Sequence, residues 1–340
     1  MAPSKICASV IGDGGWGTTL AILLSRKGYE VRLWSVFPEY AKFLSEKREN
    51  PKFLPGIPIP QKIIISSDIR AVLEGSETVI LAPPSHFMRG VVERLKGVDL
   101  SKKILVSVSK GVENETLLRM SEVIRDVLGK KIRLTILSGP TIAPEVAQGL
   151  PAMAVVASDE EELSKKVQEI FTTDHFGVYL SDDIIGVELG GSLKNVIAIA
   201  AGISDGLGLG TNTKAALFTR GLVEIARLGG KMGARVETFS GLSGMGDLVT
   251  TCLSPKSRNR WLGEQIGKGK RLDQVLKGTE MVVEGVKTAL SALELGKKYK
   301  MELPITQEVK AVLYDGKDPL LAVKDLMGRP RGDEIKLWSQ

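Results

Sequence analysis

Lys194 is the residue whose type and surroundings point most directly to chemistry. It lies in the apolar segment 186–203, whose leucines and isoleucines recur at helical spacing and predict a buried helix. The neighbours three and four positions away on that helix are Gly190, Gly191, Ile197 and Ala198. None of them can neutralise an ammonium, so a bound anion or a carboxylate from another element must do so. A desolvated lysine also has a tunable proton affinity. The alternative is a lysine at a helix edge that extends to solvent.

A second group with chemical potential is the run Ser257, Arg258 and Asn259, which begins a predicted helix over 258–266. Hydroxyl and amide donors, a guanidinium and the positive end of a helix dipole together suit a phosphate. The alternative is ordinary capping by Ser257, followed by a solvated basic turn.

A glycine-rich loop follows the first apolar run, 5–11, and precedes the helical pattern 18–27. It reads Gly12, Asp13, Gly14, Gly15, Trp16 and Gly17. In such a loop the first glycine permits a tight turn, the second lets a pyrophosphate approach, and the third lets the helix pack on the strand. The order of strand, loop and helix therefore predicts a dinucleotide site.

The choice between NAD and NADP stays open in the sequence. An acid at the end of the second strand, 30–34, would bind the ribose of NAD, and a basic residue would bind the phosphate of NADP. Ser35, Val36 and Phe37 stand there and satisfy neither rule. Because a carboxylate repels a pyrophosphate, we expect Asp13 to point away from the cofactor.

Alternating strands and helices continue to about residue 180 and predict a doubly wound, mostly parallel sheet. The strands are expected at 78–82, 104–108, 134–137, 152–157 and 176–180, with helices ending at 95 and spanning 116–128 and 160–171. From 184 onward the pattern is helical, with helices expected at 184–204, 213–228, 258–266, 284–299 and 306–314. We therefore predict two domains, 1–182 for dinucleotide binding and an all-α domain, 183–340, for substrate and catalysis.

Composition narrows the function classes. The 340 residues exceed what one core usually serves. A net charge of +6 is spread among 40 acidic residues, so nucleic-acid binding is not indicated. Two cysteines are too few for a disulfide framework or a zinc site. The N-terminal run is too short for a signal peptide, and the longest apolar stretch, 196–203, is too short for a membrane span. We expect a soluble cytoplasmic protein without a metal ion.

Several motifs together resemble the NAD(P)-dependent sn-glycerol-3-phosphate dehydrogenases of the bacterial type. They are Gly12–Gly17, Lys110-Gly111, Ser138–Thr141 with Ala143 and Glu145, Leu193–Val196, Gly206–Gly210 with Asn212 and Lys214, Gly246–Leu248, Ser257–Arg260 and Val283–Gly285. The resemblance extends over nearly the whole chain. Asp13 departs from the small residue usual at its place, and Val36 stands where many bacterial relatives have a basic residue.

The resemblance implies a Rossmann-type domain joined to a helical domain. It also implies reduction of dihydroxyacetone phosphate to sn-glycerol 3-phosphate, a precursor of membrane lipid, with reduced NAD or NADP as hydride donor. Residues matching the substrate site are Lys110, Gly139, Thr141, Lys194, Asp247, Ser257, Arg258 and Asn259. Those expected at the cofactor, with the loop glycines Gly12, Gly14 and Gly17, are Gly15, Trp16, Lys110, Ala143, Arg258, Val282 and Glu284.

Reduction of a ketone leaves negative charge on oxygen, which must receive a proton. The chain has only two histidines, His86 and His175, so the usual imidazole donor is scarce. Lys194, which matches the family's catalytic proton donor and acceptor, is the predicted donor. We expect Asp247 and Asn195 to orient it, Lys110 to add positive charge, and Arg258 with its neighbours to hold the substrate phosphate.

Two other functions compete with this one. A related two-domain hydroxy-acid dehydrogenase would use Arg258 to hold a carboxylate. A non-catalytic NAD(P)-sensing protein would keep the fold without the chemistry. Against the sensor stands the set of Lys110, Lys194, Asp247 and Arg258, which a binding protein would not need. A homodimer is possible, since the helical domain is large enough to bury a second surface.

Overall fold

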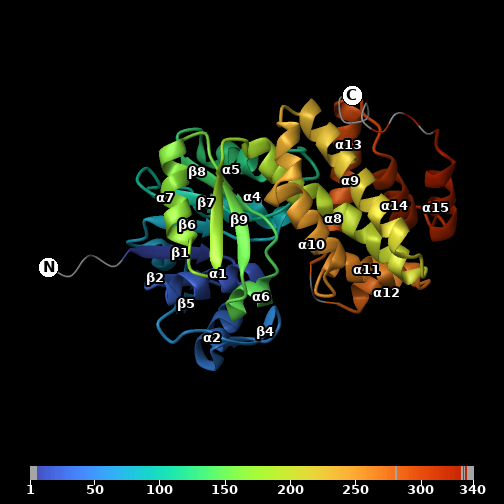
Figure 1. Cartoon of the computed structure of the whole chain (residues 1–340). Coiled ribbons are helices and arrows are strands. Elements are labelled where there is room, and N and C mark those ends of the chain that lie inside the picture. The colour runs from blue at the N-terminus through green and yellow to red at the C-terminus, as the bar shows by residue number, and fades with distance from the viewer. Residues whose placement is uncertain (1–5, 280–281, 331, 333, 335–340) are drawn as a thin grey trace. The chain divides into compact units, whose positions relative to one another are not determined.

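The computed structural model describes residues 6–279, 282–330, 332 and 334. The chain divides into two compact units (Figure 1). Unit 1 comprises Met1–Ser109 and Met120–Ile184, and unit 2 comprises Lys110–Arg119 and Ile185–Gln340. The ten residues Lys110–Arg119 thus belong with the helical unit, which differs from a simple division at residue 182.

Unit 1 is built on an eight-stranded sheet of order β10-β9-β8-β7-β6-β1-β2-β5. The strands are β1 (Cys7–Ile11), β2 (Glu30–Trp34), β5 (Ile64–Ser66), β6 (Thr78–Leu81), β7 (Ile104–Ser107), β8 (Arg133–Ser138), β9 (Ala152–Ala157) and β10 (Phe176–Ser181). All neighbours are parallel except β8 and β9, which are antiparallel. The central strands are buried along their whole length, as a sheet covered on both faces requires. The predicted fold class is confirmed.

The elements around this sheet are α1 (Gly15–Arg26), α2 (Pro38–Lys47), α3 (Ile69–Leu73), α4 (Met88–Glu93), α5 (Met120–Leu128), α6 (Ala143–Gln148) and α7 (Glu161–Phe171), with a hairpin of β3 (Glu49–Asn50) and β4 (Leu54–Pro58). The helix predicted over 116–128 was too long. It begins only at Met120, because Val112 and Arg119 form an antiparallel bridge and Val112 packs into the core of unit 2.

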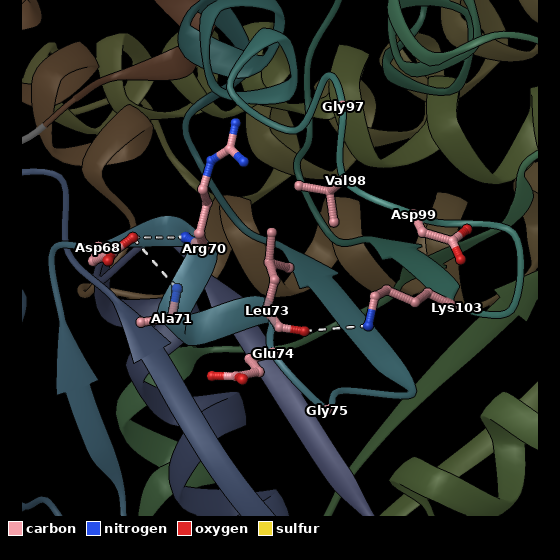
Figure 2. A pocket seen from close by; sticks show the side chains of 10 residues that line it. All are labelled: Asp68, Arg70, Ala71, Leu73, Glu74, Gly75, Gly97, Val98, Asp99 and Lys103. Atoms are coloured by element: carbon pink, nitrogen blue, oxygen red, sulfur yellow. Dashed lines mark hydrogen bonds between the residues drawn. The ribbon is translucent and has the colours of Figure 1, made fainter.

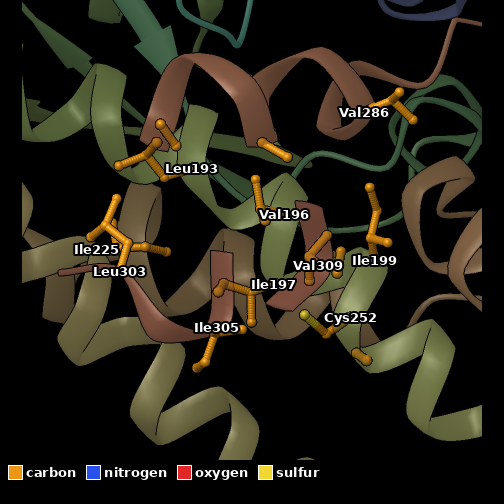
Figure 3. Close-up of a cluster of buried hydrophobic side chains, with 14 of the residues drawn as sticks. Leu193, Val196, Ile197, Ile199, Ile225, Cys252, Val286, Leu303, Ile305 and Val309 are labelled. Atoms are coloured by element: carbon orange, nitrogen blue, oxygen red, sulfur yellow. The ribbon is translucent and has the colours of Figure 1, made fainter. Parts of the chain in front are cut away.

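Unit 2 is helical. Its helices are α8 (Ile184–Gly206), α9 (Thr211–Lys231), α10 (Asp247–Leu253), α11 (Arg258–Gly267), α12 (Leu272–Lys277), α13 (Glu284–Lys298), α14 (Pro304–Tyr314) and α15 (Pro319–Gly328). A cluster of aliphatic side chains surrounds α8, whose Leu193, Val196 and Ile197 lie at its centre (Figure 3). The helix carrying Lys194 is therefore the core helix that its apolar spacing predicts.

Two glycines set the distance between α8 and α11. A Cβ on Gly202 would lie 1.9 Å from the carbonyl oxygen of Arg260, and one on Gly263 would lie 2.0 Å from that of Ile199. The backbones can approach this closely only because both side chains are missing. This contact brings the first turn of α11 beside α8.

By length and composition alone, α8 could also cross a membrane. However, 89% of its most apolar window is buried inside the protein, as in the core helix of a globular domain.

Candidate active site

The glycine loop of unit 1 has the geometry that its sequence predicts. Gly12 has a φ of +120°, and a Cβ there would meet the Ala82 carbonyl oxygen at 2.9 Å. A Cβ on Gly17 would lie 2.0 Å from the Gly12 oxygen, whereas one on Gly14 would meet nothing within 4 Å. The open side at Gly14 and the first-turn N–H groups of α1, which have no acceptor within the helix, suit a pyrophosphate.

Ala143 lies beside this loop. The Thr19 hydroxyl donates to its carbonyl oxygen at 3.1 Å, and its Cβ is 3.9 Å from where a side chain on Gly15 would begin. Trp16 is half-buried, with its ring centroid 6.4 Å from that of Phe176. Ala143 and Gly15, both predicted at the cofactor and 128 residues apart in sequence, are therefore brought together in unit 1.

Gly139 and Thr141 follow the carboxyl end of β8. Gly139 has a φ of +147°, and the Thr141 hydroxyl donates to its carbonyl oxygen at 3.2 Å. Because β8 runs parallel through the sheet with β1, both residues lie at the same sheet edge as the glycine loop.

Asp13 is turned towards the end of β2. The Ser35 hydroxyl donates to Asp13 Oδ2 at 2.5 Å. Burial raises the pKa of the Asp13 carboxyl, while the Ser35 hydrogen bond and the charge of Lys52 act in the opposite direction.

Unit 1 also contains a pocket of about 550 Å³, and Figure 2 shows the side chains that line it. It is lined by α3 and by the segment 97–103, which precedes β7, so it faces the amino ends of the strands. Lys103 Nζ donates there to the Leu73 carbonyl oxygen at 3.2 Å. None of the residues predicted for substrate or cofactor lines it.

In unit 2, Lys194 is met by a carboxylate from another helix. Its side chain is only 6% exposed, and its Nζ donates to Asp247 Oδ1 at 2.6 Å and to the Thr251 hydroxyl. The second oxygen of Asp247 accepts a hydrogen bond from Lys110 Nζ, also at 2.6 Å. One buried carboxylate therefore binds two ammonium groups. The alternative that Lys194 lies at a helix edge and extends to solvent is excluded.

The surroundings of Lys194 set its proton affinity. Burial is the largest cause and lowers its pKa to about 8, an effect that Lys110 reinforces and Asp247 opposes. Near neutral pH the side chain can therefore both give and accept a proton. Cys252 lies close by, but burial raises the pKa of its thiol to about 12, so it stays protonated.

A second polar group joins three helices of unit 2. Asn195 Oδ1 accepts a hydrogen bond from Asn259 Nδ2 at 2.9 Å, and Asn259 Oδ1 accepts one from the Gly285 N–H at 2.9 Å. The Asn195 carboxamide is therefore hydrogen-bonded to α11, and its role in orienting Lys194 stays a prediction. Besides Asp247, the Thr251 hydroxyl contacts Lys194 Nζ.

Arg258 is the first residue of α11 and is exposed, so its guanidinium can reach a ligand. Ser257 caps the helix, since its hydroxyl accepts the Arg260 N–H at 3.3 Å. Val282 and Glu284 are half-buried at the start of α13. Burial lowers the pKa of the Arg258 guanidinium, and the charge of Glu284 acts in the opposite direction. Capping by Ser257 and a ligand-binding Arg258 are therefore compatible.

Two residues contribute to the site but were assigned no individual role there from the sequence, although Gly285 belongs to the Val283–Gly285 motif. Thr251 stands four residues after Asp247 on α10, so both side chains share one helix face, a spacing that could have revealed it. Gly285 contributes its N–H and its lack of a side chain, since a Cβ would lie 2.7 Å from both the Asn195 carbonyl oxygen and Asn259 Oδ1. No sequence spacing would have indicated that close approach.

Comparison with known families identifies both parts of the chain. Residues 7–164 match the model of the NAD-dependent glycerol-3-phosphate dehydrogenase N-terminus, and residues 183–324 match that of its C-terminus. The chain belongs to the NAD-dependent glycerol-3-phosphate dehydrogenase family. Among the described residues of this dehydrogenase, no group of three His, Cys, Asp or Glu side chains could hold a metal ion.

Relatives of this glycerol-3-phosphate dehydrogenase match it over most of their length. A protein of Syntrophotalea carbinolica named glycerol-3-phosphate dehydrogenase (NAD(P)+) is 49% identical over 322 residues, which cover 94% of this chain and 97% of the relative. The crystal structure of glycerol-3-phosphate dehydrogenase from Coxiella burnetii has a TM-score of 0.93 at 38% identity and covers 96% and 100% of the two chains. The corresponding enzyme of Saccharomyces cerevisiae has a TM-score of 0.80 at 27% identity, over 96% and 100%.

Proposed function

We propose that this dehydrogenase interconverts dihydroxyacetone phosphate and sn-glycerol 3-phosphate with NAD(P)H, and that Lys194 is its proton donor and acceptor. The product would supply glycerophospholipid synthesis. The observation that carries the proposal is a buried lysine with a pKa of about 8, fixed by the Asp247 carboxylate that also holds Lys110. A structural ion pair would not need a second ammonium on the same carboxylate.

When bound, a reduced nicotinamide would supply the hydride that adds to the carbonyl carbon. As the carbon–oxygen π pair moves onto oxygen, the Lys194 ammonium gives that oxygen its proton and becomes neutral. Asp247 and Thr251 hold Nζ in place, and the Lys110 ammonium adds positive charge beside the developing oxyanion. In the reverse direction, neutral Lys194 accepts the proton of the alcohol.

The substrate phosphate is assigned to the first turn of α11. Arg258 offers an exposed guanidinium, and the N–H groups of this ten-residue helix add the positive end of its dipole. Asn259 has both ends of its carboxamide engaged within the protein, so it positions the turn and retains one further N–H for a ligand. Gly139 and Thr141 of unit 1 are proposed as further substrate contacts.

The cofactor contacts are proposed in three groups. The loop residues Gly12, Gly14, Gly15, Trp16 and Gly17, with Ala143 beside them, would bind the pyrophosphate and its surroundings. Arg258, Val282 and Glu284 would contribute from unit 2. Lys110 would lie near both substrate and nicotinamide. These assignments are supported by the open side of the loop at Gly14 and by the exposed Arg258.

Location and assembly are also part of the proposal. Cys7 and Cys252 are free and buried, which supports a reducing, cytoplasmic location for an enzyme that acts on a small molecule without membrane insertion. The exposed apolar side chains Leu320, Leu321 and Met327 of α15 support a homodimer. Light scattering of the purified protein would measure its oligomeric state.

Steady-state kinetics with dihydroxyacetone phosphate and with short 2-keto and 3-keto acids tests the activity. We expect kcat/KM for the phosphorylated ketone to exceed that for either acid by roughly a hundredfold or more, because the acids lack the phosphate group that the first turn of α11 would bind. Preference for a keto acid would favour the hydroxy-acid dehydrogenase. Nucleotide binding without turnover of any ketone would favour the sensing protein.

A further inference from the structure

The end of β2 holds a carboxylate that does not come from β2. In nucleotide-binding sheets of this kind, an acid at this place accepts a hydrogen bond from the adenosine ribose 2′-hydroxyl. Here Ser35, Val36 and Phe37 follow the strand. The carboxylate of Asp13, from the glycine loop, is instead hydrogen-bonded to Ser35 at 2.5 Å.

The backbone fixes this arrangement. The Gly12 N–H donates to the Trp34 carbonyl oxygen at 3.2 Å and ties the loop to the end of β2. The Asp13 carbonyl oxygen accepts hydrogen bonds from Asn50 Nδ2 at 2.7 Å and from the Thr18 hydroxyl at 3.1 Å. Asn50 is completely buried, so the loop rests on a rigid support. The carboxylate is therefore held at the strand end and not free to follow a ligand.

We infer that Asp13 is the residue that selects NAD over NADP, in place of the acid that β2 lacks. Its carboxylate can accept several hydrogen bonds, and Ser35 uses one of them. A ribose 2′-hydroxyl can donate to it, whereas a 2′-phosphate brings a second negative charge against it. This inference rests on the proposed function, because it assumes that the glycine loop binds the nucleotide.

Lys52 is the competing determinant. It is exposed and close enough to lower the pKa of Asp13, so its ammonium could attract a 2′-phosphate. An exposed cation is strongly screened by solvent and salt, while the Asp13 carboxylate is fixed by Ser35 and partly buried. We therefore expect the carboxylate to dominate.

Isothermal titration of the full-length enzyme with NADH and with NADPH tests the inference by binding alone. The parent should bind NADH at least about tenfold more tightly than NADPH. Asp13→Asn, which keeps the shape and the Ser35 contact, should reduce this ratio to about threefold or less. Asp99→Asn is the matched control, since it removes an exposed carboxylate before β7, at the opposite edge of the sheet, and should leave the ratio unchanged.

A competition between adenosine 5′-monophosphate and adenosine 2′,5′-bisphosphate on the parent provides a measurement that needs no variant. The monophosphate should bind more tightly. The inference is overturned if the parent binds NADPH as tightly as NADH, or if Asp13→Asn keeps the parental ratio. If the parent binds neither dinucleotide, the proposed function fails together with the inference. A parental preference for NADPH that is lost in Lys52→Ala but kept in Asp13→Asn would assign selection to the lysine and overturn the inference as well.

Discussion

Asp247→Asn is the substitution that most sharply separates a tuned catalytic lysine from a structural ion pair. It removes one negative charge from a carboxylate whose two oxygens lie 2.6 Å from Lys194 Nζ and from Lys110 Nζ. The side chain is 2% exposed, so little water can replace the lost charge. Because that charge favours the protonated form of Lys194, its removal must lower the pKa of the lysine below the parental value of about 8.

The size of the effect follows from Coulomb's law. Two unit charges about 3 Å apart interact by about 1.4 kcal/mol at the dielectric constant of water and by about 5.5 kcal/mol at an effective value of 20. Since about 1.4 kcal/mol corresponds to one pH unit, the titration midpoint of Lys194 should fall by at least about one pH unit. At neutral pH most of the lysine would then be neutral and unable to donate a proton.

The assay is kcat/KM for reduction of dihydroxyacetone phosphate across a pH series, which reports the ionisation of the free enzyme. Reduction needs protonated Lys194, so the parental value should decline above a pH of about 8. In Asp247→Asn the decline should begin at least about one pH unit lower. Asp205→Asn is the control, because that carboxylate also binds two cations, Lys214 and Arg260, but does not contact Lys194. An unchanged or higher midpoint in Asp247→Asn would refute the reasoning.

Four further substitutions have distinct expected outcomes. Gly17→Ala should unfold at a markedly lower temperature, because its Cβ would lie 2.0 Å from a backbone oxygen. Gly14→Ala should keep the parental melting temperature but lose affinity for NADH, because its Cβ would meet no protein atom. Equal melting temperatures of the two variants would contradict this expectation. Arg258→Ala should mainly raise KM for the phosphorylated ketone, by a penalty of about 2 to 5 kcal/mol, and parental kinetics would place the phosphate elsewhere. Glu224→Ala should lower the free energy of unfolding by about 2 to 4 kcal/mol, because the buried Glu224 carboxylate accepts hydrogen bonds from two backbone N–H groups and from the Thr306 hydroxyl at the start of α14. Urea denaturation would measure this loss. A loss below about 0.5 kcal/mol would argue against the expected role.

The elements with strong periodicity could be predicted from the sequence. The strands Glu30–Trp34 and Ala152–Ala157 have the expected bounds, and the predicted helix over 184–204 extends two residues further, to Gly206. Short elements such as α3 and α12 could not be predicted, because five or six residues carry too little periodic signal. The start of α5 was misplaced because residues 116–119 have a helical pattern but pair with a segment that packs in the other unit.

The candidate site was partly predictable for a similar reason. The Lys194 ammonium has no carboxylate within reach on its own helix, which implies a partner from another element. That partner is Asp247. The sequence could not show that the same carboxylate also binds Lys110, since 137 residues separate the two. It predicted that Asp13 would avoid a pyrophosphate, but its contact with Ser35 depends on how the ends of β1 and β2 lie side by side.

The central claim is that Lys194 transfers the proton, and Lys194→Met tests it most directly. Methionine fills the buried site without a charge and leaves Asp247 paired with Lys110. We predict that kcat falls by roughly 10² to 10⁴ in both reaction directions, while the dissociation constant for NADH stays within about twofold of the parent. A variant that keeps most of its kcat in either direction would contradict the account.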